Sequence, residues 1–191
     1  MKRLRVVWIT LALLTVPLIA YAQSKPLPET YVSDEVTTFR YPTGWTIDAE
    51  QPGLVIVTTK DHAIQLGSDF MSPGEAAVIV LFSNADDAYL REYFEENSPT
   101  AMMNHLIQRL LVPNLRGDLK FTALETVEFA NFPAVRSSTT FQDNNFSLIL
   151  ADRGNGLYSL VIAITAASEF NKYEPKLLTI AESVHYQPRS Q

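Results

Sequence analysis

The sequence predicts an α+β domain in which a central antiparallel β-sheet is sandwiched between helices. Two short apolar runs rich in β-branched residues, Ala76 to Phe82 and Leu157 to Ile164, leave no polar face and predict strands that are covered on both sides. Two stretches with apolar residues at helical spacing can supply the covers. The remaining strand candidates are joined by tight turns, and connections this short require antiparallel neighbours.

The last helix is expected directly after the run Leu157 to Ile164. Pro175 follows Glu174, and proline suits the first turn of a helix, where its missing N–H would be unpaired anyway. The predicted helix therefore begins near Glu174 and folds back onto the sheet. Its apolar stripe consists of Leu177, Ile180, Ala181 and Val184.

A second helical region is expected in two pieces between Ala85 and Val112. Ser98 and Pro99 are suited to the N-cap and the first position of the second piece, and Pro113 ends it. Its apolar residues recur at helical spacing and should face the sheet. They are Met102, Met103, Leu106, Ile107, Leu110 and Leu111.

The segment from Phe39 to Trp45 predicts a first hairpin. Phe39 and Tyr41 alternate onto one face of a strand, a turn contains Pro42 and Gly44, and Trp45 begins the next strand as a core residue. Further strands are expected at Leu54 to Thr59, Ala63 to Leu66, Phe121 to Phe129, Val135 to Phe141 and Phe146 to Ala151. Their turns are expected at Asn131-Phe132-Pro133, Asp143-Asn144-Asn145 and Arg153-Gly154-Asn155-Gly156.

The first 22 residues have the three parts of a secretory signal peptide. A basic start is followed by an apolar run and by Ala20-Tyr21-Ala22, which predicts cleavage between Ala22 and Gln23. The alternative is an uncleaved membrane anchor, but the apolar run is shorter than the roughly 20 residues of a spanning helix. We expect a signal peptide at 1–22, an extended linker at 23–34, one domain at 35–187 and a tail at 188–191, with the product outside the cytoplasm.

Charge and cysteine usage exclude several classes of function. The formal net charge is −6, and removal of the basic leader makes it more negative still. An acidic domain argues against general binding to nucleic acid or anionic lipid, which requires Lys and Arg at phosphates. The chain has no cysteine, which rules out disulfides, thiolate metal sites and cysteine nucleophiles.

The residue patterns assign no catalytic, cofactor-binding or metal-binding residue. His62, His105 and His185 have no metal-ligand spacing, and each is interpreted as a surface or boundary histidine. There is no nucleophile elbow and no phosphate-binding glycine fingerprint. Asp61 and His62 could form half of a proton-transfer pair, which keeps an enzyme as the alternative hypothesis.

The order of features resembles the PsbP-like family, which is related in fold to the Mog-type Ran-binding proteins. The resemblance extends over residues 35 to 187. It is carried by Phe39 to Trp45 and by Tyr158 to Val184, which includes Glu169-Phe170, Tyr173-Glu174-Pro175 and Ile180-Ala181-Glu182-Ser183-Val184. The resemblance implies an antiparallel sheet between helices and a mostly non-catalytic role. Plant and cyanobacterial members act as extrinsic subunits or assembly factors of photosystems.

We therefore expect an exported, non-catalytic binding or assembly protein with a PsbP-like domain. Its expected partner is an envelope or membrane-associated protein, without nucleic acid, without a cofactor and without a transmembrane helix after cleavage. The short leader is not a chloroplast transit peptide, and photosynthesis is not implied. The alternative is an extracytoplasmic hydrolase or metal-dependent enzyme that uses Asp61 and His62.

Overall fold

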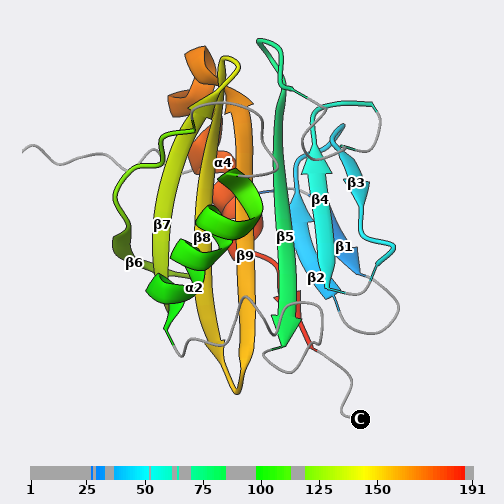
Figure 1. Ribbon diagram of the computed structural model, residues 1–191. Coiled ribbons are helices and arrows are strands. Elements are labelled where there is room, and N and C mark those ends of the chain that lie inside the picture. Colours follow the sequence, from blue (N-terminus) through cyan, green and yellow to red (C-terminus); the bar gives the residue numbers. More distant parts are fainter. Residues whose placement is uncertain are drawn as a thin grey trace, which may run out of the picture.

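The structure is a computed structural model that describes residues 27, 29–32, 37–51, 53–61, 64, 70–84, 98–112 and 119–187. Seven strands of this part of the chain form one antiparallel sheet in the order β3-β4-β5-β9-β8-β7-β6 (Figure 1). They are β3 (Thr46–Asp48), β4 (Leu54–Thr58), β5 (Ala76–Asn84), β6 (Glu125–Phe129), β7 (Phe132–Phe141), β8 (Asn144–Gly154) and β9 (Leu157–Ala166).

Both apolar runs lie in the middle of this sheet, as the sequence predicts. β5 and β9 pair along their whole length, from Ala76 opposite Thr165 to Asn84 opposite Leu157. Helices α2 (Pro99–His105) and α4 (Phe170–Glu182) cover opposite faces of the sheet (Figure 1). The predicted α+β architecture is confirmed.

The strands divide their side chains between two cores. On the α4 face, alternate residues such as Val78, Val80 and Val161 pack against Leu177 and Ile180. On the α2 face, Ile79 and Ile162 belong to the core that contains Met102 and Met103. Because successive side chains of a strand point to opposite faces, a nearly unbroken apolar run supplies both cores at once.

The second helix begins as predicted. The Ser98 hydroxyl accepts a hydrogen bond from the Ala101 N–H at 3.3 Å, and Pro99 occupies the first turn. After His105 the helix widens into a π-helical segment, η1 (Leu106–Leu111), which the spacing does not indicate. Met102, Met103, Leu106 and Ile107 are buried.

The prediction that the last helix begins near Glu174 is wrong. A 3₁₀ turn, η2 (Ala167–Glu169), leads directly into α4 at Phe170, so Pro175 lies inside the helix. Only the first N–H groups of a helix lack internal partners, and Pro175 therefore costs one backbone hydrogen bond. The early start is held by contacts to the turn before β5, where the Gly74 N–H donates to Glu169 and the Tyr173 hydroxyl donates to the Gly74 carbonyl.

The first predicted hairpin does not form. β2 (Thr37–Tyr41) pairs with β1 (Glu29–Val32) and β10 (His185–Tyr186) in a separate three-stranded sheet, whereas β3 pairs with β4. The Pro42–Trp45 turn thus carries the chain from one sheet to the other. Residues 29–32 of the expected extended linker form β1, because β-forming side chains such as Tyr31 can pack on Phe39, with ring centroids 5.0 Å apart.

Several strand ends and turns differ from the predictions by a few residues. Two hairpins use two-residue turns, Ala130-Asn131 and Gln142-Asp143, in which both residues have positive φ. Turns of this kind match the twist of the flanking strands. Phe132 and Asn144 therefore begin strands. β6 begins at Glu125. Before it, the Ser138 N–H donates to the Thr122 hydroxyl at 2.9 Å and not to a backbone carbonyl.

Trp45 is predicted to be a core residue, but its side chain is only half-buried. Its ring lies at the edge of the α4 core, with the Lys176 ammonium 4.9 Å from the ring centroid. We expect Trp45→Ala to cost about 1.5–2.5 kcal/mol, roughly half of the cost for a fully buried aromatic residue. Urea denaturation measures this change. A loss of more than about 4 kcal/mol would show that the ring is buried.

Some predictions fall outside the described residues. They are the signal peptide with its Ala22–Gln23 cleavage point, the first helical piece from Ala85, the tail 188–191, and most of the strand Ala63 to Leu66. Among the helices that the structure does describe, none is long and apolar enough to cross a membrane.

Candidate functional site

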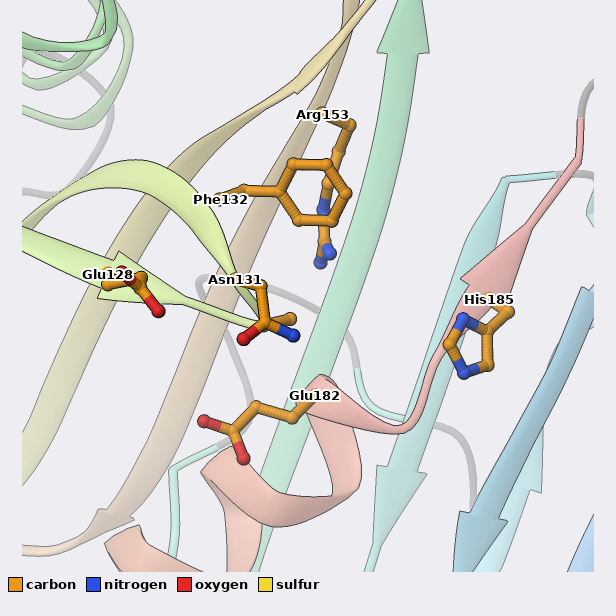
Figure 2. Close-up of a pocket in the computed structure, with 7 residues that line it drawn as sticks. Glu128, Asn131, Phe132, Arg153, Glu182 and His185 are labelled. Atoms are coloured by element: carbon orange, nitrogen blue, oxygen red, sulfur yellow. The ribbon is translucent and has the colours of Figure 1, made fainter.

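A cleft of about 400 Å³ opens at the C-terminal end of α4 (Figure 2). Its walls come from the β6–β7 turn, the end of β8, the last turn of α4, and β10. We call it the Arg153 cleft. It is lined by Glu128, Ala130, Asn131, Phe132, Arg153, Glu182 and His185.

Arg153 is placed by a β-bulge. Asp152 is opposite Tyr158 and Gly154 is opposite Leu157, so β8 carries one extra residue, Arg153, at this point. A bulge leaves its extra residue out of the ladder and redirects the side chain. Figure 2 shows the guanidinium of Arg153 extending past the ring of Phe132 toward Asn131.

Three phenylalanine rings surround the guanidinium. Its central carbon lies 5.7 Å from the ring centroid of Phe82, 5.6 Å from that of Phe129 and 4.8 Å from that of Phe132. Phe129 and Phe132 flank the Ala130-Asn131 turn and are opposite one another in the β6–β7 register. Cation–π attraction to these rings holds the side chain without neutralising its charge.

The hydrogen bonds of Arg153 are incomplete. Nε donates to the Ser159 hydroxyl at 2.7 Å, whereas Nη2 is buried and has no hydrogen-bond partner. No carboxylate in the described part of the chain forms an ion pair with Arg153. Burial lowers the pKa of Arg153, the shift expected for a cation removed from water without a counter-charge.

Glu182 brings a second isolated charge to the Arg153 cleft. It is the last residue of α4, where the negative end of the helix dipole disfavours a carboxylate. Although much of its side chain is exposed, partial burial raises the pKa of Glu182. In Figure 2 Glu182 lies below Asn131, Glu128 lies on β6, and His185 lies across the cleft on β10.

We expect Glu182→Gln to raise the melting temperature at pH 7. Folding raises the pKa of this carboxyl group, so its ionised form destabilises the folded protein at pH values above the raised pKa. Below the pKa in the unfolded chain, about 4.3, the group is protonated in both states and has no effect on stability. The gain should therefore disappear below about pH 4. Thermal melts across this range measure it, with the exposed Glu125→Gln on β6 as the control. A lower melting temperature at pH 7 would reveal a stabilising partner of Glu182.

Of the two residues of the alternative hypothesis, the structure describes only Asp61. Asp61 is exposed after β4, and His62 lies outside the described residues. His105 is half-buried on α2, and His185 is exposed on β10 in the three-stranded sheet. Among the described residues, no three His, Asp or Glu side chains are grouped to hold a metal ion.

The fold matches known structures. Over 83% of this chain and 92% of the other, it superimposes on cyanobacterial PsbP (CyanoP) from Synechocystis with a TM-score of 0.51 and 14% identity. The protein has a PsbP-like fold. LpqN of Mycobacterium tuberculosis matches 80% of this chain with 83% of its own, at a TM-score of 0.50 and 10% identity. No family model matches the sequence, and the comparison with curated proteins finds no match.

These similarities confirm the PsbP-like resemblance at the level of the fold. They do not extend to the Arg153 cleft, because identities of 10% and 14% do not establish shared site residues. The sequence interpretation placed Arg153 in a turn and assigned it no role. One signal was visible, a cation that directly follows a buried strand, but the surrounding rings come from segments 21 to 71 residues away.

Proposed function

We propose that the protein is an exported, non-catalytic binding or assembly module of the cell envelope, and that its ligand occupies the Arg153 cleft. The observation that carries this proposal is Arg153, which lines the cleft and whose buried Nη2 has no hydrogen-bond partner. A buried donor without an acceptor costs free energy. A ligand that supplies the acceptor would recover it.

Two further observations support the envelope location. LpqN, whose fold is similar, is involved in cell envelope biogenesis of Mycobacterium tuberculosis. The leader at 1–22 has the pattern of a secretory signal. We expect N-terminal sequencing of the exported protein to begin at Gln23. A mature protein that begins at Met1 or Lys2 would contradict cleavage.

Capture from envelope extracts tests the binding role. Mature protein immobilised on beads should retain an envelope component, and Arg153→Gln should lose it. Arg40→Gln is the matched control, because Arg40 is exposed on β2 and its hydrogen bonds to the Ser183 hydroxyl use its backbone N–H and carbonyl. If Arg153→Gln and Arg40→Gln captured the component equally, the binding site would lie outside the Arg153 cleft. If no form of the protein captured a component, a binding function would be contradicted.

The alternative hypothesis, an enzyme, predicts that the function depends on Asp61 and His62 and not on Arg153. If Asp61 and His62 carried the function, their replacement would abolish it. We expect the Asp61→Asn/His62→Ala variant to be exported, folded and as effective in capture as the wild type. Loss of a hydrolytic or zinc-dependent activity of the purified protein in this variant, with capture unchanged, would favour the enzyme.

A further inference from the structure

The Arg153 cleft is lined by one cation, Arg153, and by two carboxylates, Glu128 and Glu182. Arg153 and Glu182 both contribute to its walls, yet they form no ion pair. Neither side chain has an oppositely charged partner among the described residues. The cleft thus has a positive group on β8 and negative groups on α4 and β6.

Each of the two charges is unfavourable for the fold by itself. Arg153 is held among phenylalanine rings with one nitrogen unpaired, and Glu182 lies at the wrong end of a helix dipole. Neutral side chains of similar size would avoid both costs. Groups that a protein keeps against the preference of the fold are concentrated at functional sites.

The size and walls of the cleft restrict the occupant to a small molecule or a small group. A volume of about 400 Å³ is near the lower end of the range for ligand pockets. Phe132 and Ala130 provide apolar contact within the cleft, and the Asn131 amide supplies both a donor and an acceptor. A carboxylate fits Arg153, because the planar guanidinium matches its two oxygens.

We propose that the Arg153 cleft binds a zwitterion with a carboxylate at Arg153 and an ammonium at Glu182. This inference rests on the proposed binding function and specifies its ligand class. Free amino acids and the two ends of a short peptide share this chemistry, and they differ in the separation of the charges. Glu128 and His185 border the same space and would contact the ammonium end or the apolar part of the ligand.

Calorimetric titration with a graded panel tests the proposal. The zwitterions are glycine, β-alanine, 4-aminobutyrate, 5-aminovalerate and diglycine, and the controls are butyrate and butylamine. We expect at least one zwitterion to bind about ten-fold or more tightly than either singly charged control. Tighter binding of a free amino acid or of diglycine then shows whether the ligand is an amino acid or the ends of a short peptide.

Substitutions of Arg153 and Glu182 test which charged group of the ligand each residue binds. Arg153→Gln should weaken the best zwitterion about ten-fold or more, and Arg153→Lys should weaken it less, because it keeps the charge but loses the planar fork. Glu182→Gln should remove the preference for the zwitterion over butyrate. Arg40→Gln and Glu125→Gln, both outside the cleft, should bind as the wild type does. Circular dichroism confirms that each variant is folded.

Two results would overturn the proposal: no panel member binds up to about 10 mM, or butyrate binds as tightly as every zwitterion. Arg153-dependent capture of an envelope component, with no binding of the panel, would overturn the zwitterion site and leave the proposed function intact. Zwitterion binding that depends on Arg153 and Glu182, with no captured component, would support the site and contradict the assembly role.

Discussion

Phe39→Ala should lower the free energy of unfolding by about 3–5 kcal/mol, the usual cost of truncating a buried aromatic residue. Phe39 is only 1% exposed and is among the largest fully buried side chains. Its ring contacts Tyr31 and Tyr41 in the small sheet and belongs to the core that α4 covers. The substitution therefore removes one of the contacts through which the small sheet packs on the rest of the domain. Urea denaturation monitored by circular dichroism measures the loss.

Thr38→Ala provides the control on the same strand. Thr38 is next to Phe39, points to the other side of β2 and is only half-buried. Its substitution should change stability by less than about 1 kcal/mol. If Phe39→Ala cost no more than Thr38→Ala, the small sheet would not be held to the domain by this ring.

Met103→Ala should lower the free energy of unfolding by about 2–5 kcal/mol, because it disrupts the core on the opposite face of the sheet. Met103 is completely buried in α2, within the core that includes Ile79 and Leu148. Truncation leaves a cavity between the helix and the sheet, and close-packed surroundings relax only partly around it. Asn104→Ala, the exposed neighbour on the same helix, should change stability by less than about 1 kcal/mol.

The double variant Phe39→Ala/Met103→Ala tests whether the two cores unfold as one cooperative unit. Phe39 and Met103 lie on opposite faces of the sheet, in different core clusters. Distant substitutions usually add to within about 0.5 kcal/mol. We therefore expect an additive loss and a single unfolding transition. Two separate transitions would show that the small sheet and the α2 layer unfold independently.

The layered architecture was predictable because the local pattern and the global fold agree. Strands β5 and β9 are apolar on both faces over most of their length, and a strand of this kind is stable only between two covering layers. Ser98-Pro99 also determined a helix start locally, since a cap depends on residues that are adjacent in the chain. The PsbP-like resemblance rests on the same elements.

The errors have a common physical cause. Pro175 has a strong preference for a helix start, but contacts of Glu169 and Tyr173 with Gly74 begin the helix earlier. Trp45 was predicted in the core on its hydrophobicity, yet it packs at the rim beneath Lys176. In both cases a partner far away in the sequence outweighs the local propensity, and single-residue patterns do not contain that partner.

By itself, the sequence determined the sheet between two helical layers, the acidic and cysteine-free character of the chain, and the pattern of a secretory leader. The tertiary structure alone decided that β2 leaves its expected hairpin to pair with β1 and β10, and that Arg153 meets Phe82, Phe129 and Phe132. The reason is the range of the interactions. Periodicity records which face of an element is buried, whereas the Arg153 cleft depends on which distant segments are neighbours across that face.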